Sequence, residues 1–505
     1  MTPEHLDVLV VGAGLSGVGA AVHLKQLCPD RSFAVLEARD AIGGTWDLFR
    51  YPGIRSDSDM YTLGYRFKPW TNAKAIADGP SILSYIHETA REYDVDRHIR
   101  VSHRVVRASW SGSDARWTVE VERGAQQGVA GERTVLTCSF LFLCTGYYNY
   151  EHGYTPDFAG IERFQGRVVH PQKWTPDIDY SGQRVVVIGS GATAVTLVPS
   201  MTDRAQHVTM LQRSPTYILA LPGQDKLANW MNRRLPLRLA YGITRWKNVL
   251  KSALFYRLSK RRPQLIRKLI LKEAQRALGP SCDVSKHFSP SYNPWDQRVC
   301  LVPDADLFKV IRQGKASVVT DHIETFTERG IRLRSGQELP ADLVVTATGL
   351  DLLAFGGMEI VVDGRRIEPH DTLSYKGMML SDVPNLAYAF GYTNASWTLK
   401  ADLTCEYVCR LLKHLRASGN QIAVARRDPA VQPEPLLDFT SGYVQRGIGR
   451  FPQQGDRAPW KLHQNYFRDI QVLRRGDIDD GTLVFGKAQP AAVAALDDRL
   501  ARRAA

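Results

Sequence analysis

Two glycine-rich segments, each placed directly after a run of apolar residues, constrain this chain more than any other feature of its sequence. The first is DVLVVGAGLSG, residues 7–17, and the second is RVVVIGSGATA, residues 184–194. A strand, a tight glycine turn and a helix in this order make a site for the pyrophosphate of a dinucleotide. The sequence therefore predicts an α/β protein with two Rossmann-like dinucleotide-binding domains.

The first segment has every part of such a site at the expected spacing. Gly12 permits the tight turn, Gly14 lets the backbone approach the pyrophosphate, and Gly17 lets the helix pack closely on the strand. The helix that follows directs its N-terminus at the negative charge. The next predicted strand, SFAVLE, ends on Glu37, whose carboxylate can accept hydrogen bonds from ribose hydroxyls.

A second glycine pair indicates which dinucleotide this half binds. Gly43 and Gly44 continue a nucleotide-binding loop, and in two-domain flavoproteins such a pair is typical of FAD rather than NAD. A redox CxxxxC pair would follow in disulfide reductases, but no cysteine lies between Cys28 and Cys138. The first half is thus predicted to bind FAD without passing electrons to a nearby disulfide.

The second segment follows the GxGxxA variant, and its following strand ends differently. That strand, HVTMLQR, ends on Arg213, where a carboxylate would repel a 2′-phosphate and a guanidinium can bind one through two hydrogen bonds. We therefore predict an NADPH site. Its candidate residues are Gly189, Ser190, Gly191, Ala192, Thr193, Ala194, Val195, Thr196, Arg213 and Ser214.

Two further strands that end in Thr-Gly mark where the chain passes between the nucleotide domains. They are FLFLCTGYY, residues 140–148, and DLVVTATGLDL, residues 342–352. The predicted order is a first FAD part (1–150), a first NADPH part (151–218), a basic helical insertion (219–310), a second NADPH part (311–380), and a second FAD part with the C-terminal region (381–505).

The positive charge of the chain is concentrated in the insertion. The net charge is +13, and residues 226–276 hold fifteen Lys or Arg against one acid, Glu273. Apolar residues are interleaved at helical spacing: Trp230, Leu235, Leu239, Trp246, Leu250, Leu254, Phe255, Leu265 and Leu269. Such helices pack an apolar face on the protein body, or they lie on an anionic membrane surface. No nucleic-acid-binding module surrounds the stretch, and nucleic acid is not an expected partner.

The rest of the composition is that of an ordinary globular protein. We find no run of 18 apolar residues and no signal peptide, and the seven cysteines show no CxxC pair. Free thiols and a cytoplasmic location, peripheral to the membrane if the basic helices bind lipid, are expected. Cys405 and Cys409 lie one helical turn apart without a His nearby, so we expect them to pack and expect no metal site.

The segment between the two halves, FQGRVVHPQKW, carries a family resemblance. Its Phe164, Gly166, His170 and Trp174 match FxGxxxHxxxW, the fingerprint of type I (class B) flavoprotein Baeyer–Villiger monooxygenases. GGTWDLFRYPGIRSDSDMYTLG, YNPWDQR and GYTNASWTLKADL resemble a mycobacterial branch of this family that oxygenates thioamides. One departure is Thr175, where the family usually has Pro or Asp.

The resemblance implies a reaction. NADPH reduces FAD, O₂ then gives a C4a-peroxyflavin, and one oxygen atom is inserted into a ketone to give an ester or lactone, or added to the sulfur of a sulfide or thioamide. The implied partners are O₂ and a small apolar ketone or sulfur compound. Arg298, in YNPWDQR, aligns with the family's active-site arginine, and Asp57, in RSDSDMY, aligns with the carboxylate beside it. A guanidinium cannot lose its proton and can stabilise an oxygen anion.

Further contacts are carried over by position. Residues expected to line the FAD are Ser16, Gly44, Thr45, Trp46, Asp47, Leu48 and Val105, and Arg55 and Ser56 are expected between the cofactors. His170 and Trp174 are expected to couple the domains rather than to act as acid or base.

Two alternatives remain. One is a flavin-containing N- or S-oxygenase without Baeyer–Villiger activity. The other, from a different class, is a catalytically idle flavoprotein on a membrane surface, which predicts little NADPH oxidation.

The cofactor preference is testable at Arg213. Many family members have Lys just before the catalytic Arg, but here it is Gln297, so phosphate selectivity is expected to depend on Arg213 and Ser214. Arg213→Ala should raise the KM for NADPH about tenfold or more, which is ~1.4 kcal/mol of binding per decade, and should leave the KM for NADH nearly unchanged. Steady-state kinetics with both cofactors checks this, and an equal loss for both would refute the assignment.

Overall fold

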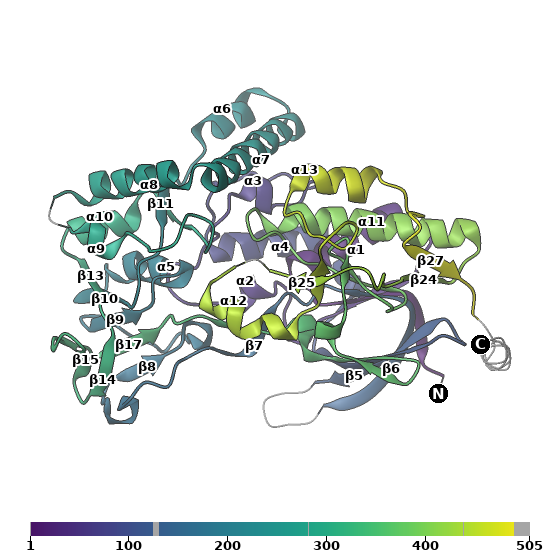
Figure 1. Ribbon diagram of the computed structural model, residues 1–505, viewed down its shortest axis with the longest axis horizontal. Helices are drawn as coiled ribbons and strands as arrows, with labels where there is room; N and C mark the ends of the chain where they lie inside the picture. Colours follow the sequence, from purple (N-terminus) through teal and green to yellow (C-terminus); the bar gives the residue numbers. More distant parts are fainter. Residues whose placement is uncertain (1, 125–130, 281, 438, 489–505) are drawn as a thin grey trace.

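The computed structural model describes residues 2–124, 131–280, 282–437 and 439–488. It contains two main sheets side by side, with a layer of helices running along one edge of the molecule (Figure 1). The first sheet has the order β20-β19-β4-β5-β6-β1-β2-β3. These strands are β1 (Glu4–Val11), β2 (Phe33–Leu36), β3 (Ile99–Arg100), β4 (His103–Ser111), β5 (Arg116–Arg123), β6 (Glu132–Leu143), β19 (Glu359–Val362) and β20 (Arg365–Ile367).

The long strand β6 joins two kinds of pairing in this sheet. It runs parallel to β1 along most of its length, antiparallel to β5 in its first part, and parallel to β23 (Leu386–Tyr388) in its last part. Helices α1 (Leu15–Leu27), α4 (Gly79–Glu92) and α11 (Trp397–Ser418) contribute to the core on one face. Successive residues of β1 point to opposite faces: Val8 and Val10 join that core, and Leu9 and Val11 join the core on the other face.

The second sheet is entirely parallel, with the order β13-β10-β9-β17-β8. Its strands are β8 (Arg167–Val169), β9 (Arg184–Ile188), β10 (His207–Gln212), β13 (Ala316–Thr320) and β17 (Leu343–Thr346). Helices α5 (Ala192–Met201) and α10 (Asp306–Arg312) share a core with one face, and β14 (Ile323–Thr327) and β15 (Gly330–Leu333) share a core with the other. Continuous buried runs such as RVVVI are what a sheet covered on both faces requires.

The predicted second NADPH part, residues 311–380, contains strands of more than one sheet. The predicted range 311–380 holds β13 and β17 of the second sheet, a separate small sheet of β14, β15 and β16 (Glu338–Pro340), and β19 and β20, which extend the first sheet. The chain crosses between the sheets on β7 (Tyr148–Gly153) and on β18 (Leu350–Leu352). These two strands pair antiparallel, with Leu350 opposite Gly153 and Leu352 opposite Tyr148, so the crossings form one two-stranded ribbon.

The basic insertion begins and ends on a pair of parallel strands, β11 (Ile218–Leu221) and β12 (Cys300–Pro303). Between them lie α6 (Lys226–Arg234), α7 (Leu237–Arg261), α8 (Pro263–Leu278) and α9 (Val284–His287), of which α6, α7 and α8 are seen along the upper edge in Figure 1. The inner side of the insertion is buried at Ala240, Val249, Ile266 and Ile270.

One buried cation fixes α7 on the first half of the chain. Arg245 donates to the carbonyl oxygens of Tyr61 (2.8 Å) and Gly64 (2.7 Å), and its Nη2 lies 3.5 Å from Oδ2 of Asp402 on α11. Asp402 also accepts from the backbone N–H of Arg66 at 3.0 Å. A buried guanidinium with these partners is satisfied, so α7 has one position on the body.

Of the two alternatives for the insertion, packing of its apolar residues on the protein body is wrong for most of those named. Leu235 and Phe255 are partly buried, but seven side chains are exposed to solvent: Trp230, Leu239, Trp246, Leu250, Leu254, Leu265 and Leu269. The packing contacts come instead from other positions of α7 and α8. Among the described residues, no helix has the length and apolar character to cross a membrane.

The remaining elements complete the first half. They are α2 (Thr45–Leu48), α3 (Met60–Leu63), β21 (Ser374–Tyr375), β22 (Met379–Leu380), β24 (Ile422–Ala425), β25 (Pro433–Pro435), α12 (Gly442–Gly447), β26 (Gln453–Gly455), α13 (Tyr466–Asp469) and β27 (Leu483–Gly486). Cys405 and Cys409 are buried in the core beneath α11 and are packing residues there.

Candidate functional site

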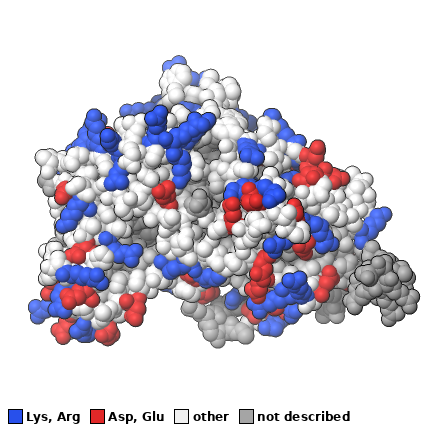
Figure 2. Space-filling model, in the orientation of Figure 1, with Lys and Arg blue, Asp and Glu red and all other residues white. Residues whose placement is uncertain are grey.

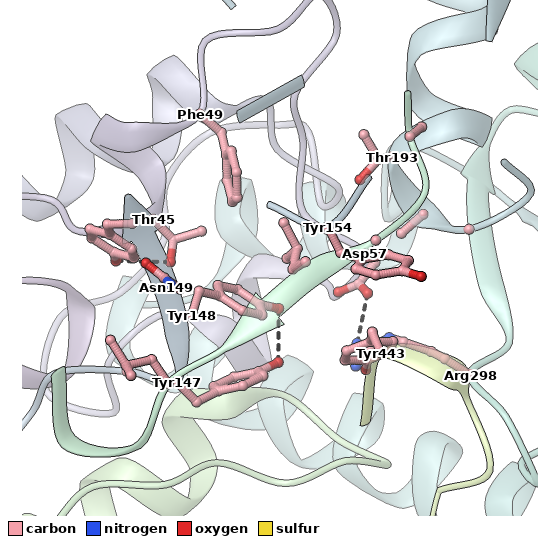
Figure 3. A pocket seen from close by; sticks show the side chains of 18 of the residues that line it. Thr45, Phe49, Asp57, Tyr147, Tyr148, Asn149, Tyr154, Thr193, Arg298 and Tyr443 are labelled. Carbon is pink, nitrogen blue, oxygen red and sulfur yellow. Dashed lines mark hydrogen bonds and ion pairs between the residues drawn. The ribbon is translucent and has the colours of Figure 1, made fainter. Parts of the chain in front are cut away.

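A single large cavity of about 1390 Å³ lies where the two sheets meet. Both glycine loops line it, as do Glu37, Arg213, Asp57 and Arg298. It exceeds the roughly 300–1,000 Å³ of a usual small-ligand pocket. The cavity thus offers one continuous space beside both predicted nucleotide sites, and Figure 3 shows part of its lining.

The glycines of the first loop let its backbone pack closely on neighbouring strands. Gly12 has φ +100°, and a Cβ there would lie 2.6 Å from the carbonyl oxygen of Cys144. A Cβ on Gly17 would lie 1.8 Å from the carbonyl oxygen of Gly12. Only glycine fits at these two positions, which keeps the start of α1 close to the ends of β1 and β6. The loop and the N-terminus of α1 can therefore receive a pyrophosphate.

Glu37 is held in place by backbone donors. Its Oε2 accepts from the N–H of Ala13 at 2.7 Å, and its Oε1 accepts from the N–H of Arg39 at 3.0 Å. Burial raises the pKa of Glu37, and these two hydrogen bonds oppose that rise. The carboxylate lines the cavity at the end of β2, where the predicted ribose contact lies.

Most residues predicted for the FAD site line the cavity. These are Gly12, Gly14, Ser16, Glu37, Gly44, Thr45, Trp46, Arg55, Ser56 and Val105. Asp47 and Leu48 do not line it: the Asp47 carboxylate is buried and pairs with Arg39 (2.6 Å) and Arg50 (2.5 Å). Arg55, predicted between the cofactors, lines the cavity and pairs with Asp306 on α10.

The second glycine loop has the same construction. Gly189 has φ +140°, and a Cβ there would lie 2.3 Å from the carbonyl oxygen of Ala347. Beside Gly191 there is open space, since no heavy atom lies within 4 Å of an added Cβ. The cavity-lining residues here are Gly189, Ser190, Gly191, Ala192, Thr193, Thr196, Arg213 and Ser214, whereas Ala194 and Val195 are buried against the sheet.

Arg213 follows β10 at the cavity wall and its side chain is exposed. Within the part of the chain that the structure describes, no carboxylate lies within ion-pair distance of its guanidinium. Its charge is therefore available to an anionic group entering the cavity.

Arg298 and Asp57 form an ion pair at the wall between the two loops. Arg298 Nη2 lies 2.7 Å from Asp57 Oδ2, as Figure 3 shows. Arg298 comes from the end of the insertion, two residues before β12, and Asp57 comes from the loop that precedes α3. The negative charge of Asp57 raises the pKa of Arg298 against the opposing effect of burial, so the guanidinium keeps its proton.

Three tyrosines near this pair were not predicted from the sequence. Tyr147, Tyr148 and Tyr443 line the cavity, and their electrostatic interaction with Arg298 adds to its raised pKa. The hydroxyl oxygens of Tyr147 and Tyr148 are 2.8 Å apart, and the Tyr147 ring stacks on Trp397 with centroids 5.2 Å apart. Burial raises the pKa of all three tyrosines. Tyr147 and Tyr148 end the segment FLFLCTGYY, whose Thr-Gly pattern could have indicated them. No sequence pattern indicated Tyr443.

The fingerprint segment lies outside the cavity, against the two-stranded ribbon. His170 Nδ1 accepts from the N–H of Gln172 at 3.2 Å, so Nε2 carries the proton and donates to the carbonyl oxygen of Gly349 at 3.1 Å. Burial lowers the pKa of His170, which favours the neutral ring. A Cβ on Gly153 would lie 2.0 Å from the imidazole Cε1. The ring thus contacts the end of β7 and the residue directly before β18.

The other fingerprint residues pack in the second half. Phe164 is buried against Phe326, with centroids 6.0 Å apart, and Trp174 is buried against Tyr180 at the same separation. A Cβ on Gly166 would lie 2.4 Å from the carbonyl oxygen of Asp342. These contacts fix the segment around His170.

Comparison with known proteins decides the family. Residues 75–359 match the model described as flavin-binding monooxygenase-like, and residues 10–76 match the model of an NAD(P)-binding Rossmann-like domain. The chain belongs to the flavin-binding monooxygenase-like family. This flavin-binding monooxygenase is 56% identical to the FAD-containing monooxygenase EthA of Mycobacterium tuberculosis, over 97% of this chain and 99% of EthA. The predicted enzyme class, a flavoprotein monooxygenase, is confirmed.

Two solved structures show the same fold. An oxidized steroid monooxygenase bound to NADP matches with a TM-score of 0.74 at 22% identity, covering 96% of this chain and all of that one (100%). A cyclohexanone-bound cyclohexanone monooxygenase in its rotated conformation matches with a TM-score of 0.69 at 18% identity, covering 85% and 90% of the two chains. The predicted fold of two Rossmann-like dinucleotide-binding units with a helical insertion is confirmed.

The contact between Gly153 and His170 gives a test of the joint. Gly153→Ala adds a methyl group that must displace the imidazole, and we expect roughly 10- to 100-fold less oxygenated product per NADPH consumed. Product yield and NADPH consumption, measured together, check this.

Gly242→Ala on α7 is the matched control, because no heavy atom lies within 4 Å of its Cβ and its φ is ordinary. In a helix interior this change should be neutral or slightly stabilising. Parent-like coupling in Gly153→Ala, or an equal loss in Gly242→Ala, would contradict a role for this contact.

Proposed function

We propose that this protein is an FAD- and NADPH-dependent monooxygenase that inserts one oxygen atom of O₂ into small apolar ketones and adds one to the sulfur of sulfides or thioamides. The observation that carries the proposal is the Arg298–Asp57 ion pair at 2.7 Å, in the wall of a cavity lined by both glycine loops. The family membership and the similarity to EthA, a protein named as FAD-containing, support it.

The residues present fit both cofactors. The first loop leaves room for a pyrophosphate because a side chain at Gly12 or Gly17 would collide with backbone, and Glu37 can accept from a ribose. The open space beside Gly191 suits NADPH, as does the charge of Arg213, which pairs with no carboxylate of the described residues. When bound, reduced FAD supplies the activation of O₂, which no side chain of the chain can perform.

Arg298 places a positive charge in the cavity wall, where the oxygen that attacks the substrate would carry a negative charge. A guanidinium with a raised pKa stays protonated at every pH at which the protein is folded, so its N–H donors remain aimed at the cavity. Asp57 orients the guanidinium through this ion pair. We assign Arg298 the role of stabilising the anionic oxygen before and after it attacks the substrate, and Asp57 that of positioning Arg298.

The tyrosines keep this region neutral and apolar. Because burial raises their pKa, Tyr147, Tyr148 and Tyr443 keep their protons and add no negative charge beside Arg298. Their rings, together with Trp397, occupy space that water would otherwise fill. Exclusion of water protects a reactive oxygen species and strengthens the field of Arg298.

We assign His170 to the joint between the nucleotide-binding halves. It donates to Gly349, directly before the crossing strand β18, and lies against Gly153 on the crossing strand β7, so a movement of one half must move or break these contacts. This supports a coupling role and no transfer of protons.

An ¹⁸O₂ experiment tests the proposed function. Purified FAD-loaded protein with NADPH, a phenyl ketone and an alkyl aryl sulfide should give an ester and a sulfoxide, each with one atom of ¹⁸O, seen by mass spectrometry. Sulfoxide without ester would favour the N/S-oxygenase alternative. NADPH consumption without labelled product would refute oxygenase activity, and no consumption would favour an idle flavoprotein.

A further inference from the structure

The outer side of the insertion carries a largely exposed apolar strip, in which Trp246 also meets the rings of Tyr466 and Phe467 at α13, with centroids 6.0 and 6.1 Å away. Eleven of its side chains are between 38% and 59% exposed: Leu227, Trp230, Leu237, Leu239, Ile243, Trp246, Leu250, Leu254, Leu258, Leu265 and Leu269. From Leu239 to Leu258 on α7 they recur every three or four residues, which places them on one side of the helix. A contiguous exposed apolar surface of this kind marks an interaction site.

Positive charge accompanies this strip on all three helices. Ten exposed Lys or Arg have no carboxylate within ion-pair distance in the part of the chain that the structure describes: Lys226, Arg233, Arg234, Arg238, Lys251, Arg257, Arg261, Arg262, Lys268 and Lys272. The only acid of the stretch, Glu273, pairs with Arg276 at 3.7 Å. Figure 2 shows Lys and Arg along the upper edge, where Figure 1 places these helices.

Exposed apolar side chains and positive charges on the same surface favour one kind of binding partner. A second copy of the chain would bring the same positive surface to the interface, and like charges would repel. A nucleic acid would satisfy the cations but would gain nothing from eleven exposed apolar side chains. An anionic bilayer satisfies both, because its headgroups attract Lys and Arg while its interface accepts Leu and Trp.

We propose that the outer side of α6, α7 and α8 binds the surface of an anionic lipid bilayer. Arg245 and Asn248 anchor α7 from the inner side, the latter by a hydrogen bond of 2.9 Å from its Nδ2 to Asp59 Oδ1. The proposal is independent of the reaction assigned above.

Helix α7 also contacts the segment that leads to the cavity wall. Lys260 on α7 donates to the carbonyl oxygen of Trp295 at 3.2 Å, and the Tyr256 ring meets the Trp295 indole with centroids 5.6 Å apart. Trp295 lies three residues before Arg298. The same helix therefore carries part of the proposed docking surface and contacts the segment that leads to Arg298.

Vesicle flotation tests the proposal. FAD-loaded full-length protein is mixed with vesicles of equal parts phosphatidylglycerol and phosphatidylcholine, or of phosphatidylcholine alone. We expect binding to the anionic vesicles, weakened by salt, and little binding to the neutral ones.

Two variants separate the contributions of charge and apolar area. Lys251→Glu, Arg257→Glu and Lys268→Glu together reverse exposed charges, and Leu250→Gln, Leu254→Gln and Leu265→Gln together remove apolar area without breaking helix preference. Each triple variant should lose at least tenfold of the binding to anionic vesicles. The rate of ketone oxidation in solution should not change.

A charge-matched control comes from arginines outside the helices of the insertion. Arg329→Glu and Arg334→Glu, on either side of β15, and Arg365→Glu, on β20, change three exposed arginines, and this triple variant should bind vesicles as the parent does. The proposal is overturned if the parent does not bind anionic vesicles at low salt, or if the control variant loses as much binding as the insertion variants. It is also overturned if the leucine variant binds like the parent, or if the parent is an oligomer that either insertion variant dissociates.

Discussion

The Arg298–Asp57 ion pair joins two parts of the chain that are far apart in sequence, at 2.7 Å. Asp57 comes from the half that holds the first glycine loop, and Arg298 comes from the return of the insertion into the second half through β12. Both glycine loops, the crossing ribbon and the insertion must be in place before these two groups meet. The proposed chemistry depends on this meeting, because it is the guanidinium that supplies a permanent positive charge to the cavity wall.

The position of the ion pair also depends on the two-stranded ribbon of β7 and β18 and on the contacts of His170 with it. The chain crosses between the sheets on two antiparallel strands, and the His170 ring lies against Gly153 of one and donates to Gly349 beside the other. Any relative rotation of the sheets changes these contacts and also changes where Arg298 and Asp57 stand. The ribbon is therefore the place where domain geometry and the geometry of the ion pair are linked.

The insertion has two different sides, and each belongs to a different function. Its inner side buries Arg245, Val249 and Ile266 and positions the segment that carries Arg298. Its outer side leaves Leu250, Leu254 and ten cations toward solvent, and these cations have no ion-pair partner among the residues that the structure describes. The membrane surface proposed here thus rests on the same rigid helices that support the cavity wall.

Local patterns predicted the nucleotide-binding parts because their physics is local. The spacing of Gly12, Gly14 and Gly17 and the end of β2 at Glu37 follow from one strand–turn–helix unit, and β9 runs over Arg184–Ile188 as the apolar run predicted. Tyr443 and the buried pairing of Asp47 with Arg39 and Arg50 depend on contacts between distant segments, which periodicity does not encode. The helical spacing in the insertion was visible, but whether its apolar side is covered depends on the packing of α7 and α8.

The charge of Arg298 can be tested most directly by removing it while keeping the volume of the side chain. In Arg298→Met, rapid-mixing absorbance should show flavin reduction by NADPH close to the parent rate, while ester and sulfoxide yields per NADPH fall ~100-fold or more. Arg298→Lys keeps a charge but loses the planar guanidinium, so its ester and sulfoxide yields should lie between those of the parent and of Arg298→Met. Parent-like yields of oxygenated product from Arg298→Met would show that the ion pair is structural and that the oxygen anion is stabilised elsewhere.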